Sequence, residues 1–177
     1  MTKAEIRAEI KRRIAALTEE QKREAAHIVA SKLASFGRTG KRIMLYNALP
    51  DELDMSEAAK LLCEGNELFY PVVDGDDMYA APSGEMRRGA FGILEPGGVR
   101  MTAKEAALDV IVVPLRAFDA ECMRVGRGKG YYDRFLEDGS ALKVAVAFDQ
   151  QRVDSVPTEA HDVPMDAVVT PSEIYRR

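Results

Sequence analysis

The hydrophobic pattern at the start of the chain predicts two consecutive amphipathic helices. In the first, apolar residues recur at spacings of three or four, at Ile6, Ile10, Ile14 and Leu17. The second keeps apolar residues on one helix face, at Ala25, Ile28, Val29 and Leu33. Each helix begins with a capping box, formed by Thr2 with Glu5 and by Thr18 with Gln21. We expect Gly37 to end the second helix in a left-handed conformation.

From residue 41 onward, short apolar runs predict buried strands with helices between them. The runs are RIMLY, ELFYPVV, MYAA, DVIVVPL and LKVAVAFD, each of strand length. We expect a third helix capped by Asp54 and Glu57 and ending near Gly65, a short helix over residues 102–108, and a further helix from residue 131. The Gly- and Pro-rich residues 82–98 are expected to form loops, and the residues after Asp166 an edge strand.

Continuously apolar strands separated by helices are typical of a mostly parallel sheet that is covered on both faces. We therefore predict an α/β fold, a three-layer sandwich with a Rossmann-like sheet and helices on both sides. The length of 177 residues fits a single domain spanning residues 1–177.

Composition and charge narrow the function. The formal net charge of −4 gives no global positive field, so we expect no nucleic-acid partner. No apolar run is long enough to cross a bilayer and the amino terminus alternates in charge, which favours a cytoplasmic protein without a membrane partner. Cys63 and Cys122 lack zinc-site spacing and are expected to be reduced thiols. Two histidines cannot supply a nitrogen-rich metal site, whereas carboxylates could hold a hard cation.

The segment RVGRGKGYYDRF, residues 124–135, is the strongest functional signal. Its glycines, Gly126, Gly128 and Gly130, allow a close backbone approach to phosphate oxygens. Arg124, Arg127 and Lys129 add three cations among them, and a guanidinium can bind phosphate through two parallel hydrogen bonds. Gly130 follows GK where a Walker A loop needs Ser or Thr, so a P-loop hydrolase is disfavoured, as is a dinucleotide fingerprint. A solvated basic turn is the alternative explanation.

Acidic and aromatic residues near this loop suggest a site for a metal and a flat ring. Tyr131 and Tyr132 could contact a heterocycle, although one of two adjacent tyrosines is often structural. Asp133 could hold Mg²⁺ against bound phosphates, together with Asp162 or Asp166 from the segment EAHDVPMDAVV. Surface acids without a ligand remain the alternative for Asp162 and Asp166.

The segment AFDAECMRVGRGKGYYDRFL resembles the signature of the 5-formyltetrahydrofolate cyclo-ligase family. KAEIR, ALPDELD, GILEP and HDVPMDAVVT extend the resemblance over nearly the whole chain. The family is similar in fold to the sugar isomerase and coenzyme A transferase group. The resemblance implies a magnesium-dependent reaction of ATP with 5-formyltetrahydrofolate that gives ADP, phosphate and 5,10-methenyltetrahydrofolate. Leu115, Arg116 and Cys122 depart from the family's pattern around the glycine-rich loop.

The resemblance also implies roles for individual residues. ATP would be bound by Lys3, Arg7, Arg124, Gly126, Arg127, Gly128, Lys129, Gly130, Tyr131 and Tyr132. The folate would be bound by Asn47, Glu52, Arg127, Gly128, Lys129, Gly130 and Tyr131, with Phe91 as a weaker candidate. Catalysis would rest on Arg127 and Lys129, and Mg²⁺ on Asp133 and Asp162.

Lys3 and Arg7 are four residues apart, which places them on one helix face. The reaction would proceed by attack of the formyl oxygen on the γ-phosphate and ring closure by N10, which needs cations rather than a nucleophilic side chain. We expect a monomer that binds these two small molecules. The alternatives are a noncatalytic nucleotide- or folate-binding protein and an RNA-binding module; an RNA-binding module would need a basic face with exposed aromatics.

Overall fold

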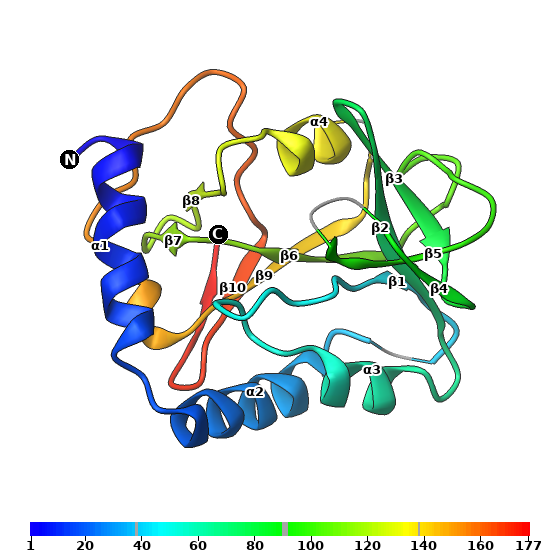
Figure 1. Ribbon diagram of the computed structural model, residues 1–177, viewed down its shortest axis with the longest axis horizontal. Helices are drawn as coiled ribbons and strands as arrows, with labels where there is room; N and C mark the ends of the chain where they lie inside the picture. Colours follow the sequence, from blue (N-terminus) through cyan, green and yellow to red (C-terminus); the bar gives the residue numbers. More distant parts are fainter. Residues whose placement is uncertain (38, 90–91, 138) are drawn as a thin grey trace.

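A seven-stranded sheet runs through the centre of the molecule (Figure 1). The computed structural model describes residues 1–37, 39–89, 92–137 and 139–177. In spatial order the strands are β11 (Ile174–Arg176), β10 (Ala167–Val169), β9 (Leu142–Val146), β6 (Val110–Pro114), β1 (Arg42–Met44), β2 (Glu67–Asp74) and β3 (Asp77–Pro82). The five inner strands are parallel, and β3 and β11 pair antiparallel at the two edges. The predicted mostly parallel sheet is confirmed.

Helices cover both faces of this sheet, as predicted. The helices α2 (Glu19–Leu33) and α3 (Ser56–Leu62) lie below it in Figure 1, and α4 (Tyr131–Glu137) lies above. The first helix, α1 (Lys3–Ala15), stands beside the small hairpin of β7 (Ala117–Phe118) and β8 (Arg124–Val125). A 3₁₀ turn, η2 (Asp149–Gln151), follows β9.

The apolar run of β6 shows why the central strands carry few polar residues. Val110 and Val112 belong to the core on the α1, α2 and α3 side, whereas Ile111 and Val113 belong to the core on the α4 side. All four are buried. Successive side chains of a strand point to opposite faces, so a strand covered on both sides must be apolar throughout.

The first two helices begin as the sequence predicts. Both capping boxes form, and Ile6, Ile10 and Ile14 are the buried residues of α1. The predicted cap of α3 is wrong: Met55 is the N-cap residue, and Asp54 accepts hydrogen bonds from Ser56 instead. The predicted partner of that cap, Glu57, pairs with a histidine of α2.

Two glycines beyond the helices behave differently. Gly65 is left-handed with a φ of 83°, as expected for the end of α3. Gly37 is not among the left-handed residues, so its predicted role is wrong. A Cβ on Gly37 would lie 2.3 Å from a side-chain carbon of Leu62, which shows that close packing requires glycine there.

Three further sequence predictions are corrected by the structure. Residues 102–108 form a turn rather than a helix: the box of Thr102 with Glu105 is present, but Ala107 has a φ of 46° and ends the helical path. The expected loops of residues 82–98 contain a hairpin of β4 (Met86–Arg88) and β5 (Leu94–Pro96). The strand after Asp166, β10, is not at the edge because β11 folds back outside it.

The order of the strands places a crevice between β1 and β6. From β1 the chain continues to β2 on one side, and from β6 it continues to β9 on the other. Ligands of open α/β sheets bind at the carboxyl ends of the strands where the direction of winding reverses in this way. Among the described residues, no helix has the length and apolar character needed to span a membrane.

Candidate active site

A cavity of about 480 Å³ lies at the carboxyl ends of β1 and β6. Its apolar wall is lined by Leu49, Pro71, Val73, Met78, Ile93 and Leu115. Its polar wall comes from α1, the glycine-rich loop and the loop before β10. An apolar wall facing a few converging charges is typical of a site for a ligand that has both a flat ring and an anionic part.

Two of the three glycines in the glycine-rich loop adopt backbone conformations that favour glycine. Gly128 and Gly130 are left-handed, with φ values of 102° and 70°, and other residues would be strained there. Gly126 is not left-handed, but a Cβ on it would lie 3.0 Å from Nη1 of Arg124. A Cβ on Gly128 would lie 3.5 Å from the guanidinium of Arg7. Glycine therefore lets the cations pack directly against the loop backbone.

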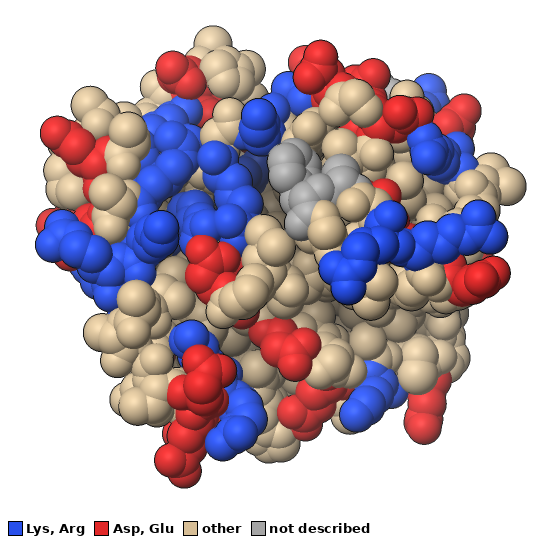
Figure 2. Space-filling model, viewed as in Figure 1, with Lys and Arg blue, Asp and Glu red and all other residues tan. Residues whose placement is uncertain are grey.

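Five cations line the cavity, although the chain is acidic overall. They are Lys3, Arg7, Arg124, Arg127 and Lys129. Figure 2 shows Lys and Arg side chains gathered over the region of α1 and β8. Arg7 Nε donates to the carbonyl oxygen of Gly126 at 2.7 Å, which joins α1 to the loop. Lys129 is exposed and has no ion-pair partner among the described residues.

Arg124 is the most buried of these cations. Its side chain is 4% exposed and its Nη2 lies 2.6 Å from Oδ1 of Asp133. Burial lowers the pKa of the guanidinium, and the neighbouring Asp133 opposes this shift. Arg124 Nε is buried and has no hydrogen-bond acceptor among the described residues. Because an unpaired buried donor is costly, this atom favours an anionic ligand in the cavity.

Lys3 joins α1 to the acidic loop before β10. Its Nζ lies 2.7 Å from Asp162 and 2.9 Å from Glu159. Burial alone would lower the pKa of Lys3, but the hydrogen bonds to Asp162 and Glu159 outweigh it and the pKa is raised. Burial likewise opposes the effect of Lys3 on Asp162, whose pKa is lowered overall. Both groups are therefore charged at neutral pH.

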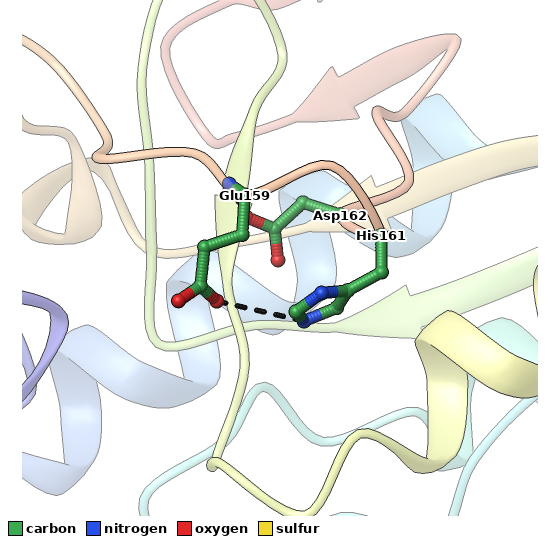
Figure 3. A group of neighbouring side chains, drawn as sticks. All are labelled: Glu159, His161 and Asp162. Atoms are coloured by element: carbon green, nitrogen blue, oxygen red, sulfur yellow. Dashed lines mark hydrogen bonds and ion pairs between the residues drawn. The ribbon is translucent and has the colours of Figure 1, made fainter.

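Asp162 belongs to a group of three potential metal ligands (Figure 3). One ligand atom from each of Glu159, His161 and Asp162 lies within 4.8 Å of the others. Two carboxylates suit a hard cation such as Mg²⁺. The predicted partner Asp133 also lines the cavity but is not part of this group. Asp166 is not a lining residue, and its carboxylate accepts a hydrogen bond from the amide of Lys143 at 2.7 Å.

Tyr131 and Tyr132 both line the cavity, so both are in a position to contact a ligand. Tyr131 donates a hydrogen bond to the carbonyl oxygen of Gly75, and the guanidinium of Arg134 lies 5.5 Å from its ring centre. Burial raises the pKa of Tyr132 far above its ordinary value, so this phenol remains protonated. Two aromatic rings therefore flank the start of α4.

The two residues outside the glycine-rich loop that are expected to contact folate, Asn47 and Glu52, also line the cavity. Glu52 is 8% exposed; its Oε1 accepts from Arg127 Nε at 2.7 Å and its Oε2 from the amide of Leu49 at 2.9 Å. Asn47 donates to the carbonyl oxygen of Leu94 at 2.6 Å. Phe91, the weaker candidate, lies outside the described residues.

The three residues that depart from the family's pattern, Leu115, Arg116 and Cys122, lie in different environments. Leu115 is buried in the cavity wall. Arg116 Nη1 lies 2.5 Å from Oδ2 of Asp51. Cys122 has a φ of 60° and is fully buried, so a residue that rarely adopts this conformation shapes the turn before Arg124.

Sequence reasoning did not single out several residues that the structure places at or beside the site. They are Asp51, Glu95, Glu159 and His161. Glu159 and His161 stand in the same short segment as Asp162, and Asp51 directly precedes Glu52, so proximity in sequence was the available signal. Arg116 was noted in the sequence only as a departure from the family's pattern, because only the fold brings it to Asp51.

Comparison with known proteins agrees with this geometry. The model of the 5-formyltetrahydrofolate cyclo-ligase family matches residues 1–171. The 5-formyltetrahydrofolate cyclo-ligase of Escherichia coli (strain K12) is 31% identical over 94% of this chain and 98% of its own length. That of Haemophilus influenzae is 32% identical over 91% and 93%. The solved structure of Aquifex aeolicus 5,10-methenyltetrahydrofolate synthetase has a TM-score of 0.86 and 34% identity, covering 99% of this chain and 93% of that one. With matches of this length and a cavity of this composition, the chain belongs to the 5-formyltetrahydrofolate cyclo-ligase family.

Proposed function

We propose that this enzyme converts 5-formyltetrahydrofolate to 5,10-methenyltetrahydrofolate with ATP, releasing ADP and phosphate. The observation that carries the proposal is the composition of the cavity. Five cations and a glycine-rich loop line the cavity together with apolar residues and the buried carboxylate of Glu52. A triphosphate and a pterin ring need these two environments side by side.

The phosphate-binding wall holds the proposed ATP site. The residues assigned to ATP are Lys3, Arg7, Arg124, Gly126, Arg127, Gly128, Lys129, Gly130, Tyr131 and Tyr132, all of which line the cavity. Among the residues that the structure describes, Arg124 Nε has no hydrogen-bond acceptor and the Lys129 ammonium has no ion-pair partner, which supports anion binding there. A triphosphate would satisfy both groups.

The opposite wall holds the proposed folate site. Asn47 and Glu52 reach it from the segment after β1, and the loop residues Arg127 to Tyr131 reach it from the other side. A carboxylate has about four acceptor positions, of which Glu52 uses two for Arg127 and Leu49. Its remaining positions suit the paired N–H donors of a pterin ring.

Magnesium is the proposed metal. The carboxylates of Asp162 and Asp133, with Glu159 beside Asp162, are oxygen ligands of the type that Mg²⁺ prefers, so the residues fit the ion. These carboxylates pair with Lys3 and Arg124, which would share them with a bound metal. When bound, Mg²⁺ would neutralise charge on the phosphate oxygens.

The chemistry follows from the position of the cations. The formyl oxygen attacks the γ-phosphorus and ADP leaves, giving a phosphorylated iminium at N5. N10 then attacks that carbon and loses its proton, and phosphate departs with the former formyl oxygen. Arg127 and Lys129 stabilise the negative charge of the transferring group, so the reaction needs no nucleophilic side chain. Positioning of cations is therefore the main task of this site.

An absorbance assay tests the proposal. Purified protein, 5-formyltetrahydrofolate, ATP and Mg²⁺ should give the longer-wavelength band of the methenyl product. Omission of ATP or addition of EDTA should abolish it. If ATP or folate binds but no product forms, the chain is a noncatalytic binding protein instead.

We further infer that the chain acts as a monomeric single domain in the cytoplasm, without nucleic-acid or membrane partners. Sedimentation of the purified protein at assay concentration checks this, because a stable dimer would sediment at twice the mass of 19.5 kDa.

A further inference from the structure

Asp51 lies between two arginines from different parts of the chain. Its Oδ1 accepts a hydrogen bond from Arg127 Nη2 at 2.5 Å, and its Oδ2 lies 2.5 Å from Arg116 Nη1. The contact with Arg116 is an ion pair without hydrogen-bond alignment. Arg127 is held a second time by Glu52, through its Nε at 2.7 Å. Two consecutive carboxylates thus hold the guanidinium of Arg127, and Arg116 holds one of them from the other side.

The two arginines differ in how firmly their backbones are held. The amide of Arg116 donates to the carbonyl oxygen of Val125 at 2.7 Å, and its own carbonyl accepts from Gln151 Nε2 at 3.0 Å. The side chain of Arg116 is 11% exposed. Arg127, by contrast, stands between two glycines, which allow its backbone many conformations. The position of its guanidinium therefore depends on the carboxylates that hold it.

Glu52 alone is a poor anchor for Arg127 during the reaction. In the proposed function its carboxylate also accepts from the folate's N–H donors, so Glu52 divides its oxygens between Arg127 and the substrate. Asp51 has no such competitor, because neither Asp51 nor Arg116 is among the described residues that line the cavity. Asp51 can hold Arg127 whether or not folate is bound.

We propose that Asp51, itself held by Arg116, is a positioning residue that keeps the guanidinium of Arg127 beside the transferring phosphate. The inference rests on the proposed function and adds two residues to it. Both act through Arg127 and do not touch the substrates. Ion pairs as exposed as that of Asp51, which is 32% exposed, contribute little to stability, so their removal should affect turnover more than folding.

The test compares Asp51→Asn with and without Arg127. In the wild-type background, Asp51→Asn should lower kcat about tenfold or more, a loss of about 1.4 kcal/mol of transition-state stabilisation. The KM for ATP should rise by a much smaller factor than kcat falls, because the four other cations that line the cavity still bind the phosphates. In an Arg127→Met background, the same substitution should change kcat less than about twofold, as expected for residues acting as a unit.

Arg116 provides a second route to the same result. Arg116→Met should resemble Asp51→Asn, and Arg116→Lys, which keeps the charge, should retain more activity. The matched control is Asp74→Asn, which breaks an exposed ion pair with Arg100; neither residue lines the cavity, so kcat should be unchanged. Arg116→Met keeps the inference testable if Asp51→Asn folds poorly.

The outcomes separate this inference from the proposed function. A wild-type enzyme that forms no methenyl product overturns the proposed function, and the inference with it. A wild-type enzyme that forms product, with Asp51→Asn lowering kcat by the same factor in both backgrounds, overturns the inference alone. Unchanged kcat in both Asp51→Asn and Arg116→Met also overturns it.

Discussion

Replacement of Asp119 by alanine should destabilise the segment that precedes the glycine-rich loop. Asp119 is 5% exposed, and its carboxylate accepts three backbone hydrogen bonds. Oδ1 accepts from the amides of Glu121 and Met123 at 3.1 and 3.0 Å, and Oδ2 accepts from the buried amide of Val156 at 2.9 Å. The single side chain thus fixes the turn after β7 and ties it to the chain beyond η2.

The magnitude follows from the number of amides left without an acceptor. The Val156 amide is buried, and an unsatisfied buried donor costs about 1–3 kcal/mol. The amides of Glu121 and Met123 are partly buried and can reach water, at a cost of roughly 0.5–1.5 kcal/mol each. We expect Asp119→Ala to lower the free energy of unfolding by about 2–6 kcal/mol. Asp119→Asn keeps one carbonyl oxygen and should lose about 1–3 kcal/mol.

Urea unfolding followed by far-ultraviolet circular dichroism measures both variants, with equal slopes required for the comparison. Asp154→Ala is the matched control, because Asp154 is exposed and should change the unfolding free energy by less than about 0.5 kcal/mol. A loss below about 1 kcal/mol for Asp119→Ala, the worth of one ordinary hydrogen bond, would refute the reasoning. So would an Asp119→Asn variant as unstable as Asp119→Ala.

Three further predictions concern catalysis, packing and pH. Lys129→Ala should lower kcat on the order of 10²-fold, because this cation at the cavity acts on the transferring phosphate. The urea midpoint should not change, because Lys129 is exposed. Equal activity of the variant and wild type in the absorbance assay would remove Lys129 from the mechanism. Ile10→Ala should lower the unfolding free energy by about 2–5 kcal/mol, because the side chain of Ile10, on the buried face of α1, is fully buried. A urea midpoint within error of wild type would contradict this. Asp109 accepts from Lys41 Nζ and from the amide of Arg42, which lower its pKa below the ordinary 3.8. The stability that Asp109 contributes should be complete at neutral pH and be lost as pH falls below 3.8 through the lowered pKa, so wild type and Asp109→Asn should converge in acid urea titrations.

Local patterns in the sequence determined most of the elements. The capping boxes of Thr2 and Thr18 and the spacing of Ile6, Ile10 and Ile14 depend on residues within one or two helical turns, so they predicted α1 and α2 correctly. The glycine-rich loop also carried its own signal in its glycines and cations. The helix predicted over residues 102–108 was wrong because its capping box forms, yet the helical path ends after one turn at Ala107.

Only the tertiary structure decided which charges meet. Lys3 and Asp162 are 159 residues apart, and Arg127 and Asp51 are 76 apart, so no local pattern pairs them. The choice of Asp162 over Asp166 as a cavity residue depends on how the loop before β10 passes α1 (Figure 1). The sequence alone was sufficient for the family, the α/β fold and the loop, because those signals lie among neighbours in the chain. The strand order, which reverses between β1 and β6, determines the partners of each site residue and therefore the geometry of the site.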